Sequence, residues 1–142
     1  MYPEHLLIPM REELTRLGVE ELRTAEEVEA RLGGNTGTML VVVNSVCGCA
    51  ARNARPAVAA ALAHRVTPDA STTVFAGQDR DATERARDFF TGYGPSSPSI
   101  ALLKGTELLF MLERYQIEGR SAAEIAADLT GAFEQYCTPK SE

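Results

Sequence analysis

The stretch from Thr38 to Asn53 constrains the fold of this chain more than any other. It begins with a continuous apolar run rich in β-branched residues (TMLVVV, 38–43) and continues as NSVCGCAARN. A short apolar run of this kind predicts a strand that is buried on both faces, as in parallel sheets. The segment after Cys49 predicts a helix, because its apolar residues fall at helical spacing, namely Ala54, Val58, Ala61 and Leu62. The two cysteines therefore lie at the junction between a buried strand and the N-terminus of the following helix.

This position favours a reactive thiol. Unpaired backbone N–H groups and the positive end of the helix dipole lower the pKa of a thiol and favour the thiolate. Because Gly48 loosens the backbone, we expect Cys47 just outside the helix and Cys49 in or next to its first turn. A disulfide between them would close over one residue and be strained, as labile, catalytic disulfides are. The alternative is a pair of unreactive thiols in a tight turn.

Length and composition exclude several classes of protein. A chain of 142 residues fits one domain, 1–142, and can bury a core without disulfide staples. The formal net charge of −6 disfavours nucleic acid as a partner. The chain has no apolar run of 18 residues to span a membrane, and its first residues lack a signal-type pattern. With three cysteines, we expect a reducing cytoplasm, where a cysteine pair does redox chemistry or binds metal.

The remaining patterns complete an α/β order. Two helices are expected within residues 1–34, packed on the sheet; one is an amphipathic stretch at 3–17 whose shared face holds Leu6, Leu7, Met10, Leu14 and Leu17. The central strand is followed by a long helix, in which Pro56 predicts a bend. A second strand is expected at 72–77, and a further helix is expected to start with Asp81 as its cap. Strands at 99–103 and 107–112 form a hairpin, and a last helix follows Ser121.

A right-handed crossover makes the first two strands parallel, while the hairpin is antiparallel. The predicted fold is α/β and thioredoxin-like: a mixed four-stranded sheet with helices on both faces and extra N-terminal helices.

Our leading hypothesis for the chemistry is thiol–disulfide exchange. Cys47 would attack, and Cys49 would resolve the mixed disulfide or hold its geometry. Arg52 and Arg55 lie within two turns of the motif and could stabilise a thiolate or an anionic thiol ligand; the alternative is two solvated arginines.

Pro98 is a second candidate, because Ser97-Pro98 directly precedes a strand. We expect a cis bond there, which would expose backbone groups to an incoming peptide or thiol; the alternative is an ordinary trans proline.

Competing functions remain open. Two cysteines could hold zinc or copper(I), but a closed zinc site needs four ligands, so Cys137 and a distant histidine would have to be recruited. We therefore expect no metal, a partly buried, unreactive Cys137, and a surface position for His64; His5 is too isolated to interpret. A non-enzymatic redox sensor or scaffold is a further alternative.

Several blocks of the sequence resemble the bacilliredoxin family. The most specific is VNSVCGCAA at 43–51, followed by NARPA at 53–57. The others are TVFAGQD at 73–79, PSSPS at 95–99, and Glu113-Arg114 with IEGRS at 117–121. The resemblance extends from about Met10 to Cys137. Gln116 stands where we expected histidine, which puts in doubt any role for an imidazole in that loop.

The resemblance implies a cytoplasmic bacterial oxidoreductase that removes bacillithiol from S-bacillithiolated proteins. Cys47 would accept the bacillithiol, and Cys49 or a second bacillithiol would release it. Bacillithiol would be a co-substrate, and no cofactor would be tightly bound. The family is also described as having weak disulfide isomerase activity, so a general isomerase or reductase using another low-molecular-weight thiol is the alternative.

Together these arguments predict a substrate-binding set. Ser97 and Pro98 belong to it, and Gly48 lies between the two cysteines. Because bacillithiol carries a malate unit, we expect Arg55 or Arg114 to face the cysteines and bind its carboxylates.

Overall fold

A mixed five-stranded sheet with strand order β1–β3–β2–β4–β5 forms the centre of the computed structural model, which describes residues 2–139. The strands are β1 (Glu20–Glu21), β2 (Thr38–Asn44), β3 (Ala70–Phe75), β4 (Ser99–Lys104) and β5 (Glu107–Leu112). Strand β2 is parallel to β3 and antiparallel to β4, and β4 and β5 form the expected hairpin. Residues 1 and 140–142 of the expected domain lie outside the described residues.

The sheet has one strand more than predicted. Strand β1 has only two residues and pairs in parallel with Thr72 and Thr73 of β3. Its sequence, Glu20-Glu21, has none of the apolar alternation that predicts a strand. The expected count of four strands was therefore wrong by one short edge strand, which forms through pairing with β3.

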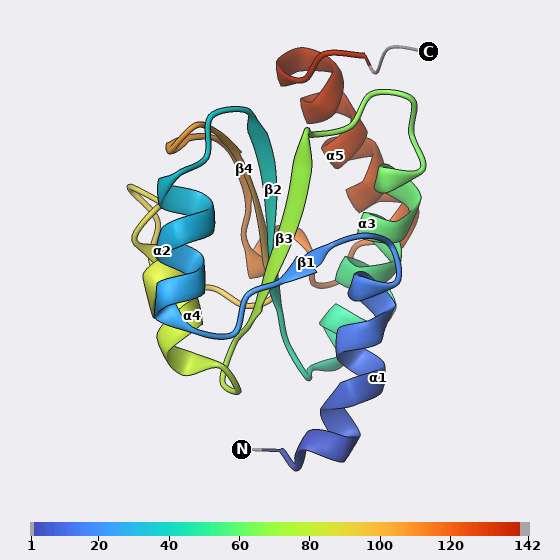
Figure 1. Ribbon diagram of the computed structural model, residues 1–142. Helices are drawn as coiled ribbons and strands as arrows, with labels where there is room; N and C mark the ends of the chain where they lie inside the picture. The colour runs from blue at the N-terminus through green and yellow to red at the C-terminus, as the bar shows by residue number, and fades with distance from the viewer. Residues whose placement is uncertain (1, 140–142) are drawn as a thin grey trace.

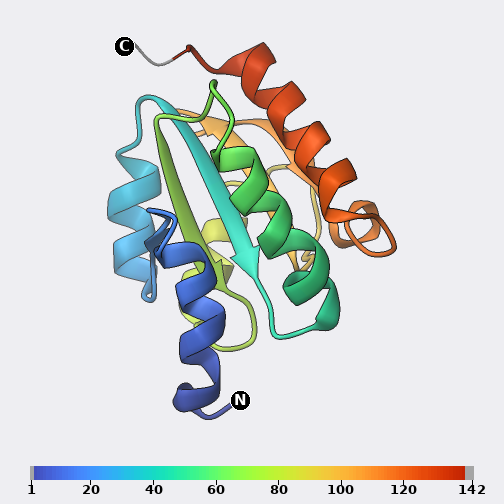
Figure 2. The same cartoon turned by 90° about the vertical axis from the view of Figure 1, so that its right-hand side faces the viewer.

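Helices cover both faces of the sheet, as predicted (Figures 1 and 2). Helices α1 (Glu4–Thr15), α3 (Arg55–Leu62) and α5 (Ala122–Tyr136) lie on one face. Helices α2 (Ala25–Gly33) and α4 (Arg80–Arg87) lie on the other. Two short elements complete the chain, a π-helix η1 (Ala50–Ala54) and a 3-10 helix η2 (Arg114–Gln116). No helix within residues 2–139 is both long enough and apolar enough to cross a membrane.

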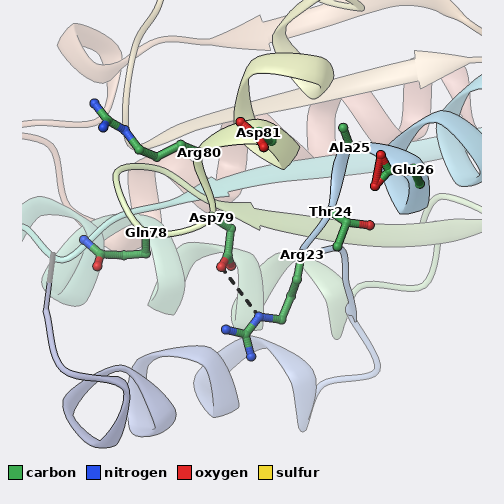
Figure 3. Close-up of a pocket in the computed structure, with 8 residues that line it drawn as sticks. All are labelled: Arg23, Thr24, Ala25, Glu26, Gln78, Asp79, Arg80 and Asp81. Carbon is green, nitrogen blue, oxygen red and sulfur yellow. Dashed lines mark ion pairs between the residues drawn. The ribbon is translucent and has the colours of Figure 1, made fainter.

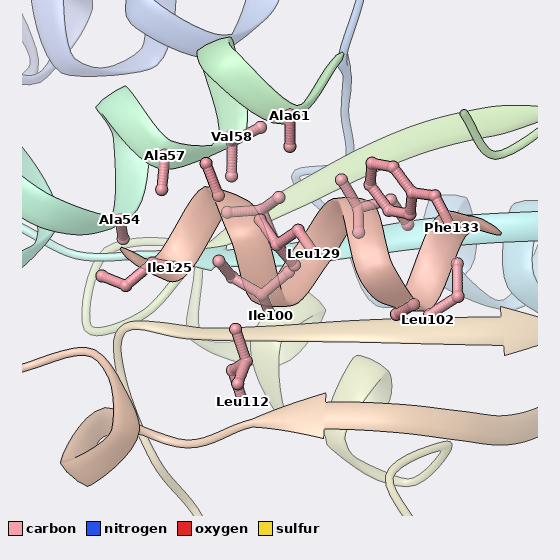
Figure 4. Packing of buried hydrophobic residues seen from close by; sticks show 14 of the residues in the cluster. Ala54, Ala57, Val58, Ala61, Ile100, Leu102, Leu112, Ile125, Leu129 and Phe133 are labelled. Atoms are coloured by element: carbon pink, nitrogen blue, oxygen red, sulfur yellow. The ribbon is translucent and has the colours of Figure 1, made fainter. Parts of the chain in front are cut away.

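Strand β2 separates two hydrophobic cores. All seven of its residues are buried, which confirms the prediction from its apolar run. Leu40 and Val42 face the core beneath α3 and α5, whereas Val41 and Val43 face the core beneath α2 and α4. Figure 4 shows the first core, in which the small side chains of α3 lie over Leu129 of α5. Both faces of β2 are thus packed against helices, which holds the strand, and the cysteine turn that follows it, in place.

Helix α1 differs from its predicted pattern. Leu7 and Leu14 are buried, but Leu6 is 47% exposed and Leu17 38% exposed. Arg11 is buried on this helix and pairs with three carboxylates, of Glu4, Glu21 and Asp79. Its guanidinium also lies 5.1 Å from the centre of the Phe75 ring. An ion-pair cluster therefore takes the place of part of the expected apolar face.

Two helix starts also differ from the predictions. The N-cap of α4 is Asp79, not Asp81, and its side chain makes no capping bond because its carboxylate is 2.6 Å from Arg11. The predicted bend at Pro56 is replaced by a change of helix type, in which η1 ends at Ala54 and α3 begins at Arg55. Pro56 falls in the first turn of α3, where its missing N–H costs little.

Candidate functional site

Cys47 lies where the chain leaves β2, one residue before the helical turn that begins at Gly48 and continues into η1. Its carbonyl oxygen accepts hydrogen bonds from the N–H groups of Ala50 (3.1 Å) and Ala51 (3.2 Å), so it caps the first turn. Cys47 is half-buried, whereas Cys49, inside the first turn, is 8% exposed. The expected placement of both cysteines is confirmed, and Cys47 is the more accessible of the two.

A buried arginine holds the turn between β2 and Cys47. Arg55 is 3% exposed, and its Nη1 donates to Asn44 Oδ1 (2.8 Å) and to the Ser45 carbonyl oxygen (2.9 Å). Its Nε donates to Glu13 of α1 at 3.1 Å. These contacts point the guanidinium toward the turn and α1, and the predicted role of Arg55 in binding substrate stays a prediction. Its Nε is occupied by α1 and its Nη1 by the turn.

Ser45 is a site residue that the sequence patterns did not single out. Its hydroxyl oxygen accepts a hydrogen bond from the Cys47 N–H at 3.3 Å, and hydrogen bonding by this hydroxyl lowers the pKa of Cys47. The available signal was a hydroxyl residue two positions before the first cysteine. The expected sources of thiolate stabilisation were instead the N–H groups at the helix start and the neighbouring arginines.

Burial and hydrogen bonds shift the pKa values of the two thiols in opposite directions. Burial opposes ionisation of Cys47, but hydrogen bonds from the Cys49 thiol, the Ser45 hydroxyl and the N–H groups of Ala50 and Cys49 lower the pKa of Cys47 below its usual value. Burial raises the pKa of Cys49, and its bond to Cys47 and the charge there raise it further. Cys47 is thus the group that ionises first, while Cys49 keeps its proton.

The cysteines open into a pocket of about 270 Å³. Its lining comes from the motif and from the loop after β5, namely Cys47, Gly48, Cys49, Arg52, Asn53, Arg114, Glu118 and Gly119. Both cysteine side chains lie close enough to Arg114 to affect it, and its pKa is raised first by its hydrogen bond to Glu118 and then by the nearby sulfurs. The pocket therefore combines two thiols with two guanidinium groups.

Arg114 connects this pocket to the proline loop. Its N–H donates to Ser96 Oγ (2.7 Å), and its Nη1 donates to the carbonyl oxygen of Ser97 (3.3 Å). The Ser97–Pro98 bond is cis, as expected. Pro98 is buried and neither Ser97 nor Pro98 lines the pocket, so their predicted role in binding substrate stays a prediction.

The other candidates lie elsewhere or serve the fold. Cys137 ends α5 near Thr38, at the end of β2 opposite to the motif, and burial raises its pKa. His64 Nε2 is 3.7 Å from a Glu134 carboxylate oxygen, and Gln116 caps η2 by accepting the Glu113 N–H. Within residues 2–139, no group of three or more His, Cys, Asp or Glu side chains is arranged to hold a metal ion.

A second hollow, of about 430 Å³, lies near the N-termini of α2 and α4 (Figure 3). It is lined mainly by charged and polar side chains, and an ion pair of 3.6 Å joins Arg23 to Asp79 there. No cysteine or histidine lines it. We therefore assign the chemistry to the smaller pocket at the cysteines.

Comparisons with known proteins agree with this assignment. A family profile described as disulphide isomerase matches residues 2–137. A bacilliredoxin from Koribacter versatilis is 58% identical over 137 residues, covering 96% of this chain and 94% of that protein. A bacilliredoxin from Bacillus licheniformis is 54% identical, with coverage of 96% and 95%.

A solved structure described as having a thioredoxin fold aligns with a TM-score of 0.58 at 19% identity, over 75% of this chain and 92% of that one. At that identity it supports the fold alone, which is the predicted thioredoxin-like fold. The two close relatives and the family profile span almost the whole length, including the cysteine motif. The chain therefore belongs to the bacilliredoxin family.

Proposed function

We propose that this thiol–disulfide oxidoreductase removes bacillithiol from S-bacillithiolated proteins. The observation that carries the proposal is the pair of unequal thiols: a half-buried Cys47 with a lowered pKa beside a buried Cys49 with a raised one. Such a pair supplies one nucleophile and keeps the second sulfur protonated until it is needed.

In the first step the Cys47 thiolate attacks the bacillithiol sulfur of the mixed disulfide. A bond forms between Cys47 Sγ and that sulfur, and the bond to the protein sulfur breaks. The protein leaves as a thiolate and takes up a proton from solvent. Two electrons have moved to the protein thiol, and Cys47 now carries the bacillithiol.

Release of the bacillithiol has two routes. A second bacillithiol thiolate can attack the sulfur bound to Cys47, which regenerates the Cys47 thiolate and forms bacillithiol disulfide. Cys49 can instead attack Cys47 Sγ and expel the bacillithiol, which leaves an internal disulfide for a further thiol to reduce. The raised pKa of Cys49 and the closure over a single residue favour the first route.

A general disulfide isomerase or reductase is the second candidate, favoured by the description of the family profile as disulphide isomerase. That function would use the same Cys47 thiolate on protein disulfides, with another low-molecular-weight thiol as partner. Both candidates fit the cytoplasmic location that we propose, because reducing conditions regenerate the dithiol.

Mass spectrometry of the chain after incubation with a bacillithiolated protein tests the proposal. We expect a bacillithiol adduct on Cys47, no adduct in Cys47→Ser, and an adduct that persists in Cys49→Ser until free bacillithiol is added. Transfer of glutathione or coenzyme A without transfer of bacillithiol would favour the general reductase instead.

A further inference from the structure

Arg52 lies against Gly48, the residue between the two cysteines. It lies four residues after Gly48, so both residues are on the same face of the helix. A methyl group built on Gly48 would be 2.5 Å from Arg52 Nη2 and 2.9 Å from its Cζ. The guanidinium therefore lies directly against the Gly48 backbone, and Arg52 lines the pocket that Cys47 and Cys49 open into.

This guanidinium has no carboxylate partner within residues 2–139. The arginines around it are all paired: Arg55 with Glu13, Arg114 with Glu118, and Arg120 with Asp128. Arg52 is thus the one cation lining the cysteine pocket whose charge is not already matched among the described residues. A carboxylate that enters the pocket could bond to Arg52 without displacing another acid.

We propose that Arg52 is the binding residue for a carboxylate on the small thiol that Cys47 exchanges, and that Gly48 is required because it leaves room for Arg52. This proposal rests on the function proposed above and names the chemical class of its ligand, a thiol bearing a carboxylate. Arg114 then plays the lesser part, because Glu118 competes for it at 2.9 Å. A charge-assisted hydrogen bond to Arg52 would hold the ligand sulfur over Cys47.

Two small disulfides of opposite character test this assignment. Dithiobis(nitrobenzoate) carries a carboxylate on each ring, whereas dithiodipyridine is uncharged, and both release a coloured thiol when a thiolate attacks. The Cys47 thiolate forms a mixed disulfide with one half of the probe, and the other half leaves as the coloured product. In a Cys49→Ser, Cys137→Ser background only Cys47 can react, so each rate reports one sulfur.

The ratio of the anionic to the neutral rate is the measured quantity, because it cancels any change in the ionisation of Cys47. We expect Arg52→Gln to lower this ratio about tenfold at low salt, and less at high salt. Gly48→Ala should lower it similarly, since the added methyl meets only the flexible end of the Arg52 side chain and displaces it. The double variant should fall no further than Arg52→Gln alone.

Arg65→Gln is the matched control, because it removes the same charge at an exposed position beyond the far end of α3 and should leave the ratio unchanged. An unchanged ratio in Arg52→Gln would overturn the assignment while leaving the proposed function standing. A further fall in the double variant would overturn the role given to Gly48. If neither probe reacts with Cys47 in the Cys49→Ser, Cys137→Ser background, both the proposed function and this inference are contradicted.

Discussion

At the scale of single residues, Cys47 owes its acidity to short-range hydrogen bonds. Burial works against the thiolate, and the donors that overcome it are the Cys49 thiol, the Ser45 hydroxyl and two N–H groups of the helix start. Arg55, one of the two arginines expected to stabilise the thiolate, instead fixes the backbone at Asn44 and Ser45. Its effect on Cys47 therefore passes through the geometry of the turn.

Ser45→Ala tests this origin of the acidity. Loss of the hydroxyl donor should raise the pKa of Cys47, so that the thiolate forms only at higher pH. A neutral hydrogen bond is worth about 1 kcal/mol, so alkylation by iodoacetamide at neutral pH should slow by about fivefold. The measurement is the alkylation rate against pH in the Cys49→Ser, Cys137→Ser background.

Two controls distinguish a raised pKa of Cys47 from a general loss of reactivity. The rates of Ser45→Ala and the parent should converge at high pH, where both sulfurs are fully ionised, and Ser45→Thr should keep the parental midpoint because it keeps a hydroxyl. A midpoint that does not move in Ser45→Ala would show that the backbone N–H groups alone hold the thiolate.

At the scale of secondary-structure elements, α1 supports the cysteine turn directly. Glu13 of α1 pairs with Arg55, 42 residues later in the chain. The Met10 carbonyl oxygen accepts a hydrogen bond from Asn44 Nδ2 at 3.3 Å. The sequence predicted that α1 packs on the sheet, but its spacing gave no sign of these contacts, because they join residues that only the folded chain brings together.

Glu13→Gln tests the contact between α1 and the turn. The substitution removes the charge that faces Arg55, which is 3% exposed and keeps its bonds to Asn44 and Ser45. We expect unfolding to become easier by about 1–2 kcal/mol, since Glu13 itself is partly exposed and its charge is partly screened. Urea unfolding should show a lower midpoint with an unchanged slope.

Glu12→Gln is the control for Glu13→Gln. Glu12 lies on the same helix but is exposed, so Glu12→Gln removes an equal charge without touching Arg55. Its midpoint should match that of the parent protein. Equal losses in the two variants would mean that the net charge of α1, and not the pair with Arg55, sets the stability.

At the scale of the whole molecule, the sequence predicted what depends on local pattern. The buried β2, the β4–β5 hairpin, the start of α5 after Ser121 and the cysteines at a helix start all carry signals within a few residues. Strand β1, the Arg11 cluster and the inward turn of Arg55 carry none. Each depends on partners from distant segments, and a polar residue is buried there only because those partners satisfy it.

The two cores predict where the molecule is most sensitive to a change in volume. Leu129 of α5 is fully buried against α3 and the sheet (Figure 4). Leu129→Ala should lower the free energy of unfolding by about 3 kcal/mol, through lost burial and the cavity left behind.

Leu6→Ala makes the same chemical change at a side chain that is 47% exposed on α1, and should lower the free energy of unfolding by less than about 1 kcal/mol. Urea unfolding of both variants separates the two cases, and similar losses would contradict the position of α5 over the sheet. Because a domain is stable by only about 5–15 kcal/mol, the larger loss is a substantial part of the total.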